Sequence, residues 1–206
     1  VTDRKLRHFD STGTDLGVWS DRSSIWAIVD CLTADYGAKI PVSELDHAYW
    51  VNLAETVDSK FDNVFTSKST IWDVMKIIAA NFKAEPVIVG SDVRLAIDSV
   101  ESLPVTLFTP DNAFDMSWST SFPERLDSNC VEVVYTDHST GLKSSVQFTP
   151  PGSDGSNPET LTMIGESDRD SAWRYGAYIY QGKYAVSDSV KFSTGMEGMI
   201  PLVGDV

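Results

Sequence analysis

The chain has 206 residues, of which 42% are hydrophobic and 22% are charged, a balance that can fill the core of one large domain or two small ones. Its net charge of −14 argues against nucleic-acid binding and against docking on an anionic membrane, because both require a basic surface. No apolar run approaches the about 20 residues that span a bilayer, and residues 1–15 lack the apolar centre of a signal peptide.

The N-terminal part begins with a polar, glycine-containing segment, residues 1–20, which we expect to be a linker or lead-in. The chain starts without Met, and this indicates a piece excised from a longer protein. Residues 21–41 predict an amphipathic helix, with N-cap oxygens between Asp21 and Ser24 and a left-handed stop at Gly37. The expected apolar stripe comprises Ile25, Ile28, Val29, Leu32 and Tyr36.

Two further helices and a hairpin are predicted next. The second helix is expected to start near Ser43 and to end by Phe61, and the third lies within residues 67–86. After Pro86 the apolar period becomes two, and residues 86–98 predict a hairpin that turns at 90–92. The expected stripes comprise Leu45, Ala48, Tyr49, Leu53 and Val57 in the second helix, and Ile71, Val74, Met75, Ile78 and Phe82 in the third.

The second half of the chain is predicted to consist mostly of strands. A Pro-Asp-Asn turn ends the first of them, and in the next Phe114, Met116 and Trp118 share one face opposite a wet face of Asp and Ser. Strands are expected within residues 103–112, 113–122, 129–137, 142–148, 160–165 and 188–195.

A loop and a late helix interrupt these strands. Residues 149–159 are dense in Pro, Gly and Ser, which predicts a long surface loop that is mobile or contacts a partner. A helix is expected near residues 168–184, capped by Ser167 or Asp168, with Gly176 allowing close packing against the sheet.

The order of these elements predicts an α+β fold, since the helices and strands do not alternate. We expect a boundary near residue 100. It would separate a subdomain of helices and a small hairpin at 21–100 from a mostly antiparallel β-rich subdomain with one late helix at 101–206. The last residues, 203–206, predict a turn into a strand that is absent, so the second subdomain is expected to be truncated.

Residues able to carry catalysis or bind metal form no recognisable pattern. His8, His47 and His138 are scattered in polar or turn contexts, which favours surface positions over metal ligation. Cys31 and Cys130 lie in apolar patterns and are predicted to be buried free thiols. We therefore expect no catalytic residue, no metal and no cofactor.

Carboxylates are abundant because the chain is acidic, and their positions favour structural roles. Asp168 and Asp170 lie in the first turn of the late helix, where the helix dipole favours negative charge. Asp111 and Asn112 are turn formers. Calcium binding by Asp154 together with Asp168 would require further oxygen ligands, which the sequence does not place.

The aromatic residues permit two interpretations. Exposed aromatic side chains in a β-rich domain could stack on sugars, which would indicate carbohydrate binding. However, Trp26, Trp72 and Trp173 follow helix starts beside apolar stripes, and Trp118 lies on the apolar face of its strand. A position in the core or in a subunit interface is therefore favoured for all four.

An ordered set of motifs runs through the chain. Residues 105–137 contain the Pro-Asp-Asn turn, a strand of serines and aromatics, and the pattern R-x-x-x-N-x-V-x-V-x-Y-x-D. The pattern occupies Arg125, Asn129, Val131, Val133, Tyr135 and Asp137, and the ending F-x-T-G-x-E-G with Gly-Asp-Val occupies Phe192, Thr194, Gly195, Glu197, Gly198, Gly204, Asp205 and Val206. In order and spacing these motifs resemble the tail-tip hub proteins of long-tailed bacteriophages, the host-specificity or tip attachment protein J-like family.

The resemblance extends over roughly residues 20–206. In the first half, the helix that ends in Tyr36-Gly37 and the helix that begins at Ser69 match family helices, and the hairpin at 86–98 follows as in the family. One departure is Val203, which stands where the family usually has the proline before Gly204.

The resemblance implies a structural protein of the virion tail tip, of phage or prophage origin and made in the host cytoplasm. Such hubs form a homotrimeric ring that closes the tail tube, and their β-barrel domains resemble tail-tube and baseplate-hub folds. Implied partners are the chain itself, other tail-tip and tail-tube proteins, and a host receptor only through distal modules. The resemblance implies neither enzymatic activity nor nucleic-acid binding by this piece.

Two other function classes stay open at this point. A carbohydrate-binding or adhesin domain would use exposed Trp and Tyr side chains. An acidic hydrolase such as a tail-associated lysozyme would need two carboxylates about 5–9 Å apart in a cleft.

Overall fold

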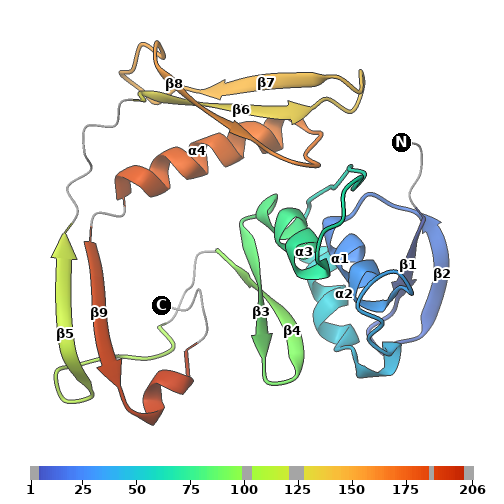
Figure 1. Cartoon of the computed structure of the whole chain (residues 1–206), viewed down its shortest axis with the longest axis horizontal. Coiled ribbons are helices and arrows are strands. Elements are labelled where there is room, and N and C mark those ends of the chain that lie inside the picture. The colour runs from blue at the N-terminus through green and yellow to red at the C-terminus, as the bar shows by residue number, and fades with distance from the viewer. Residues whose placement is uncertain (1–4, 99–103, 121–127, 186–187, 202–206) are drawn as a thin grey trace. The chain divides into compact units, whose positions relative to one another are not determined.

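The computed structural model describes residues 5–98, 104–120, 128–185 and 188–201, without the side chains of 184 and 185 (Figure 1). The chain divides into two compact units that interleave along the sequence. The first comprises Val1–Ile97, Tyr135–Ser144 and Thr162–Arg169, and the second comprises Asp98–Val134, Ser145–Leu161 and Asp170–Val206. The expected subdomains at 21–100 and 101–206 stay a prediction, since the units do not follow a single cut in the chain.

The first unit contains three helices and two antiparallel strand pairs (Figure 1). A 3-10 turn at Val42–Glu44 precedes the second helix. The three helices and the hairpin expected at 86–98 are confirmed. The elements are α1 (Ser24–Thr33), α2 (His47–Thr56), α3 (Ile71–Ala80), the pair β1 (Lys5–Phe9) and β2 (Asp15–Ser20), and the pair β3 (Ala84–Val89) and β4 (Asp92–Ile97).

Side-chain caps fix where these helices begin. The N–H of Trp26 donates to Ser23 Oγ at 3.5 Å, and Thr70 caps α3 in the same way. The N–H of Tyr49 donates to Asp46 Oδ1 at 3.1 Å, which satisfies an amide that has no partner within the first turn of α2. Helix α2 therefore begins after Asp46, and the start expected near Ser43 is wrong because the 3-10 turn takes up those residues.

The core of the first unit is built on α1 and α3. Ile25 and Ile28 of α1 and Ile78 of α3 are 0% exposed, and burial of each such side chain stabilises the fold by about 1.5–3 kcal/mol. The predicted burial of two stripe residues is wrong. Tyr36 is 70% exposed because α1 has already ended, and Ala48 is exposed because α2 turns Trp50 inward instead.

The N-terminal segment differs from the expected linker. Residues 5–20 form the β1–β2 ribbon, and Leu6 and Phe9 of β1 are buried in the core of the first unit. His8 is also buried, between the rings of Trp19 and Trp26, at centroid distances of 4.3 and 4.6 Å. The sequence does not reveal this ribbon because every residue of β2 except the half-buried Gly17 is exposed, which leaves no alternating pattern.

Gly37 has a different role from the expected left-handed stop. Helix α1 ends in extended backbone at Ala34, and the N–H groups of Gly37 and Ala38 return to the carbonyl groups of Ala34 and Cys31. A Cβ atom on Gly37 would lie 2.1 Å from the Cys31 carbonyl oxygen. Glycine is therefore required by a close backbone approach and not by a positive φ.

In the second unit, helix α4 packs on a three-stranded sheet of order β7–β6–β8 (Figure 1). The strands are β6 (Cys130–Thr136), β7 (Lys143–Phe148) and β8 (Pro158–Thr162), and α4 spans Arg169–Ala185. A Cβ atom on Gly176 would lie 3.1 Å from Val133 Cγ2 and 3.4 Å from Phe148 Cβ. The late helix and its close packing at Gly176 are therefore confirmed.

The other strands of the second unit form a two-stranded ribbon. Strand β5 (Ala113–Thr120) pairs antiparallel with β9 (Asp188–Thr194), and the 3-10 turn η2 (Met196–Met199) follows β9. The pairing shifts register between Phe114 and Ser117, where Asp115 has a φ of 54°. This is the geometry of a β-bulge.

The described strands form four separate sheets, and none of them closes into a barrel. The barrel-like arrangement therefore stays a prediction. A strand expected within 103–112 is not formed by residues 104–109, although the Pro-Asp-Asn turn is present at 110–112. The backbone of Thr109 is bonded to the turn, since the Thr109 N–H donates to Asn112 Oδ1 and the Ala113 N–H donates to the Thr109 carbonyl.

Cys31 and Cys130 are both buried, and neither forms a disulfide, as predicted. Among the helices that the structure describes, no segment combines the length and the apolar character required to cross a bilayer. The expected turn into a missing strand at 203–206 lies outside the described residues.

Acidification should destabilise the β1–β2 ribbon through His8. Burial of the ring lowers the pKa of His8 below 6.5, although the negative charge of Asp21 acts in the opposite direction. The unfolded chain therefore binds a proton at a higher pH than the native chain, and stability is lost as the pH falls below about 6.5. Urea denaturation at pH 7.5 and 5.5 should show a larger loss for the wild type than for His8→Asn. Equal losses would contradict this role.

Substitution of Gly37 tests the close approach. Gly37→Ala should lower the free energy of unfolding by about 2 kcal/mol or more, because the backbone oxygen of Cys31 must move. The control is Gly90→Asn in the β3–β4 turn, where φ is +65° and no atom lies within 4 Å of the added Cβ. Asn adopts this conformation readily, so the control should change stability by less than about 0.5 kcal/mol. Similar losses in both variants would refute the assignment.

Candidate functional site

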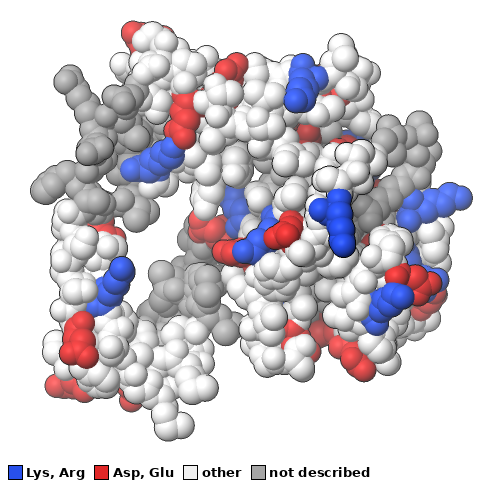
Figure 2. Space-filling model, viewed as in Figure 1, with Lys and Arg blue, Asp and Glu red and all other residues white. Residues whose placement is uncertain are grey.

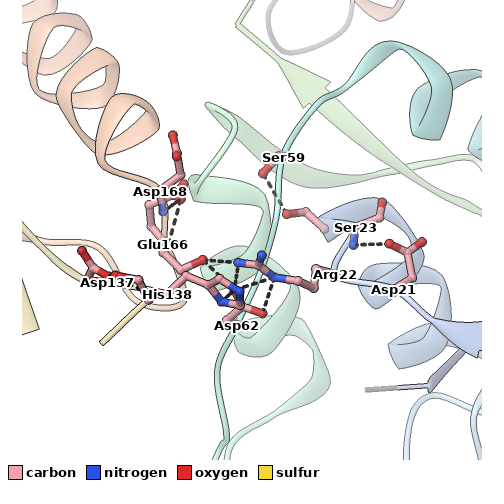
Figure 3. A network of polar contacts seen from close by, with 12 residues as sticks. Asp21, Arg22, Ser23, Ser59, Asp62, Asp137, His138, Glu166 and Asp168 are labelled. Atoms are coloured by element: carbon pink, nitrogen blue, oxygen red, sulfur yellow. Dashed lines mark hydrogen bonds and ion pairs between the residues drawn. The ribbon is translucent and has the colours of Figure 1, made fainter. Parts of the chain in front are cut away.

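A polar cluster joins Arg22, Asp62 and Ser167, which are far apart in sequence, and Figure 3 labels Arg22 and Asp62 within it. Arg22 precedes α1, Asp62 follows α2 and Ser167 precedes α4. Arg22 Nε donates to both carboxylate oxygens of Asp62 at 2.9 Å, and Arg22 Nη2 pairs with Asp62 Oδ2. Ser167 Oγ lies 2.6 Å from Arg22 Nη2 and donates to Asp62 Oδ2 at 2.5 Å. We call these three residues the Arg22 clamp.

The charges in the clamp stabilise one another. Burial acts to raise the pKa of Asp62, but the hydrogen bonds from Arg22 and Ser167 outweigh it and hold this pKa below its ordinary value. The hydrogen bond to Asp62 raises the pKa of Arg22. Both groups are therefore charged at neutral pH, and a bidentate guanidinium–carboxylate pair is among the stronger polar contacts in proteins.

Glu166 is a buried carboxyl beside the clamp, with 2% of its surface exposed. Its Oε1 accepts the N–H groups of Ser167 and Asp168, each at 2.8 Å, immediately before α4 begins at Arg169. Burial raises the pKa of Glu166, and the two N–H groups act in the opposite direction. Glu166 therefore organises the entry into α4, and its Oε1 is already committed to backbone amides.

The segment at 135–144 joins the cluster through its backbone. The N–H of Thr136 donates to the Glu166 carbonyl at 3.1 Å, and the N–H of His138 donates to the Ser167 carbonyl at 3.2 Å. The side chain of His138 is 64% exposed, and its Nδ1 lies 4.0 Å from Asp62 Oδ2. His138 is thus a surface histidine, as predicted.

The cluster does not have the arrangement of a catalytic site. Ser167 is held between Arg22 and Asp62, and its hydroxyl has no histidine base within hydrogen-bond distance among the contacts of the described residues. Two cavities of about 380 and 400 Å³ lie elsewhere in the first unit, one beside Phe9 and Trp26 and the other beside Trp50 and Val93. The cluster is best explained as a structural clamp that sequence reasoning missed, since no local pattern links residues 22, 62 and 167.

The other histidines occupy two different environments. His47 is partly buried, and its Nε2 lies 2.8 Å from the Val42 carbonyl. His8 was expected at the surface, and this is wrong because β1 places it between two indole rings. Its Nε2 is 3.1 Å from Asp21 Oδ2, although the angles are not those of a hydrogen bond. Within the described residues, no group of three or more His, Cys, Asp or Glu is placed to hold a metal ion.

The motif residue Asn129 anchors the loop at 149–159. Its Nδ2 donates to Asp154 Oδ1 at 2.5 Å, and its Oδ1 accepts the Asn157 N–H at 3.0 Å. Ser153 Oγ donates to the Asn129 carbonyl at 2.9 Å, and Gln147 Nε2 donates to the Gly155 carbonyl at 2.9 Å. The loop is thus bonded to Asn129, which immediately precedes β6, and to Gln147 of β7, while contact with a partner stays a prediction.

The remaining motif and carboxylate residues have structural positions. Val131, Val133 and Tyr135 are buried on β6, whereas Arg125 lies outside the described residues. Asp137 Oδ1 accepts the N–H groups of Ser139 and Thr140 and caps the turn after β6. Asp170 lies in the first turn of α4, as expected, and Asp168 immediately precedes the helix. Asp111 and Asn112 lie in the turn before β5.

The four tryptophans weighed for core positions differ in exposure. Trp26 is 8% exposed and belongs to the core, and Trp72 packs against that core while partly buried. Trp173 is 44% exposed and lies edge-on to Phe148, with ring centroids 5.3 Å apart. Trp118 is 67% exposed, and its Nε1 donates to Thr120 Oγ1 at 3.0 Å. A core position is therefore wrong for Trp118.

Trp118 belongs to an exposed apolar surface on the β5–β9 ribbon. Every residue of β5 after Ala113 and every residue of β9 before Thr194 is exposed. Both outer edges of the ribbon lack a paired strand among the described residues. The large exposed apolar side chains on its strands are Phe114, Met116, Trp118, Val190 and Phe192. We call this set the ribbon surface.

No protein-family model matches the chain. Among curated proteins, the chain is similar to the tip attachment protein J of Escherichia phage SECphi27, with 27% identity over 151 residues. The match covers 70% of this chain and 12% of the phage protein, so the chain spans a small part of that relative's length. The resemblance to J-like tail-tip proteins that the motifs indicate is thereby confirmed.

A solved structure, a tail protein from Neisseria meningitidis MC58, also resembles the chain. The two share 13% identity with a TM-score of 0.45, and the match covers 66% of this chain and 42% of that chain.

A double-mutant cycle measures the interaction free energy between Arg22 and Asp62 in the Arg22 clamp. The coupling free energy between Arg22→Gln and Asp62→Asn should be about 1–2 kcal/mol in urea denaturation at pH 7. It should be present above pH 3.8 and disappear as the pH falls through the lower native pKa of Asp62, because the carboxylate then takes up a proton.

The control cycle uses Arg7→Gln and Asp15→Asn. These side chains are 54% and 51% exposed, and Arg7 Nε lies 3.5 Å from Asp15 Oδ2. Solvent should limit their coupling to at most about 0.5 kcal/mol. Equal couplings in the two cycles would show that the clamp is no stronger than a surface ion pair.

Proposed function

We propose that this chain is a structural part of a phage or prophage tail tip, in which it contributes to a baseplate hub that closes the tail tube. The observation that carries the proposal is the sequence similarity to the phage tip attachment protein J over 70% of the chain. Distal modules of the longer protein would then bind the host receptor, and the piece described here would support them.

The ribbon surface supports a role in assembly. A two-stranded ribbon has marginal stability alone. Trp118 and Val190 are direct cross-strand partners and share a face of the ribbon with Phe192, and a group of exposed large apolar side chains on one face is typical of an interface. Because β5 and β9 form two different edges, copies of the chain can associate head to tail. Such a contact gives a closed ring where the rotation between copies closes, and we propose a homotrimeric ring of this kind.

The charges on the strands are compatible with contacts between copies. Strand β5 carries Asp115, and β9 carries Asp188 and Lys191, so both signs are present on the ribbon. No ion pair joins Asp115 or Lys191 to another described residue, which leaves opposite charges available to a neighbouring subunit. Assembly rather than catalysis is the function that this chemistry supports, and we propose no enzymatic activity.

Localisation in the virion tests the function directly. Antibodies raised against the chain should label the tail tip of intact phage particles in immunogold electron microscopy, and should not label the capsid or the tail shaft. Absence of label from the tip of particles whose proteins are otherwise accessible would refute the proposal.

Self-association of the chain tests the ribbon surface. In sedimentation velocity, wild-type chain should form trimers, and Trp118→Ser should raise the dissociation constant by about 30-fold, which corresponds to the loss of about 2 kcal/mol at a central aromatic contact. Ile88→Ser is the matched control, because Ile88 on β3 is also 67% exposed but lies outside the ribbon. Equal effects of the two substitutions would show that the ribbon is not part of the interface.

A second candidate function is carbohydrate binding, which the exposed indole of Trp118 favours. Its hydrogen bond to Thr120 fixes the ring at the surface, where one face could stack on a sugar. A glycan array decides between the candidates. Sugar binding that is lost in Trp118→Ala and kept in Ile88→Ala would favour the adhesin, whereas no binding with intact trimer formation would favour the hub.

A further inference from the structure

A second exposed apolar surface lies at the end of the β5–β9 ribbon. Met196 and Met199 of η2 are 85% and 82% exposed, and Ile200 is 59% exposed. In a 3-10 turn residues three apart lie on the same side, so the two methionines project together. We call these three residues, with Leu107, the methionine tip.

The backbone of Leu107 is tied to the end of β9, just before η2, by a chain of hydrogen bonds. Leu107 is 77% exposed, and its carbonyl accepts Asn112 Nδ2 at 3.2 Å. The Asn112 carbonyl in turn accepts Thr194 Oγ1 at 3.0 Å, at the end of β9. The rings of Phe108 and Phe192 meet with centroids 4.8 Å apart, which holds the segment before β5 against the end of β9.

The tip is held in shape without a partner. The N–H of Gly198 donates to the Gly195 carbonyl at 3.2 Å, and the N–H of Ile200 donates to the Glu197 carbonyl at 3.1 Å. A preformed apolar projection loses little conformational entropy on binding, and methionine adapts to irregular apolar surroundings. These properties are typical of a side-chain cluster that inserts into a groove.

The charge around the tip differs from that on the strands. Residues 104–112 and 195–201 contain two charged residues, the exposed Asp111 and Glu197, and both are acidic. In Figure 2, both blue and red atoms appear among the uncharged atoms over β5 and β9. Two copies of the tip would bring like charges together, whereas Lys or Arg side chains around a groove would complement them.

We propose that the methionine tip docks into an apolar groove with a basic rim on a different tail protein. This inference rests on the proposed function, which supplies such neighbours, and it separates two surfaces of the ribbon. The strands contact other copies of the chain, and the tip contacts the heterologous partner.

Three model peptides test the chemistry of the partner. An amphipathic helical peptide of Leu and Lys presents an apolar stripe between basic rows. A Leu/Glu peptide of the same pattern reverses the charge, and a Ser/Lys peptide removes the apolar stripe. Fluorescence anisotropy should show that the chain binds the Leu/Lys peptide at least about tenfold more tightly than the other two.

Substitution locates the contact. The double variant Met196→Ser/Met199→Ser should weaken binding of the Leu/Lys peptide at least about tenfold, and Glu197→Gln about threefold. The matched control is Ile88→Ser/Leu142→Ser, which removes two apolar side chains that are 67% and 69% exposed elsewhere. Chain labelled with photo-methionine should cross-link the peptide at Met196 or Met199, with buried Met75 and Met163 as internal controls.

Other occupants would give different results, and each would overturn the proposal. Equal binding of the Leu/Glu peptide would refute the basic rim, and unchanged binding in the methionine variant would refute the tip. Loss of self-association in that variant would identify a second copy as the partner. Binding to phosphatidylcholine vesicles that the variant abolishes would identify a bilayer.

The test is separable from that of the proposed function. Unlabelled tail tips in immunogold microscopy would refute the hub role whatever the peptides show. If the tail tips are labelled but the chain binds the three peptides equally, only docking by the methionine tip is refuted and the hub role is retained.

Discussion

The pairing of Arg22 with Asp62 is the contact on which the first unit depends, because together with Ser167 it joins three segments that the chain order keeps apart. Asp62 N–H also donates to the Gly165 carbonyl at 2.8 Å, so backbone and side chain of one residue both fix the segment that contains Ser167. At Gly165, φ is +84° and a Cβ atom would lie 2.2 Å from Phe61 Cε2. The approach of the 162–169 segment to residues 61 and 62 therefore requires both the charge pair and a glycine.

The clamp also explains why a polar cluster with a buried carboxyl need not be an active site. An isolated buried charge is costly, and proteins tolerate it where hydrogen bonds and counter-charges are complete. In this cluster Asp62 accepts hydrogen bonds from Arg22 and Ser167, and Glu166 accepts hydrogen bonds from two backbone N–H groups. A raised pKa at Glu166 follows from burial, and its position next to α4 accounts for it without a substrate.

The sequence predicted the elements that local periodicity determines. Helices α1 and α3 and the β3–β4 hairpin show clear apolar spacing, and their caps are residues of the expected type. The β1–β2 ribbon was missed because only β1 contributes to the core, through Leu6 and Phe9, while the apolar side chains of β2 are exposed. The clamp was missed for a related reason, since contacts across 40 and 145 residues leave no trace in local spacing. Trp118 shows a different limit of sequence patterns. An apolar strand face predicts that the face is buried, but it does not tell whether the same chain or another protein buries it.

The two surfaces of the β5–β9 ribbon connect this limit to function. In the first unit, apolar side chains spaced at helical periods are covered by the chain's own helices, as Ile25 and Ile78 show. On the ribbon, equally apolar side chains such as Trp118 and Met199 are exposed while their backbone is fixed by pairing and turns. Because an acidic chain is kept apart from its copies by repulsion, association must concentrate where charge is sparse or complementary. The strands carry both signs of charge, whereas the methionine tip carries only acidic residues. The two contacts that we propose, with other copies and with a basic neighbour, would therefore use different parts of the ribbon and would not compete.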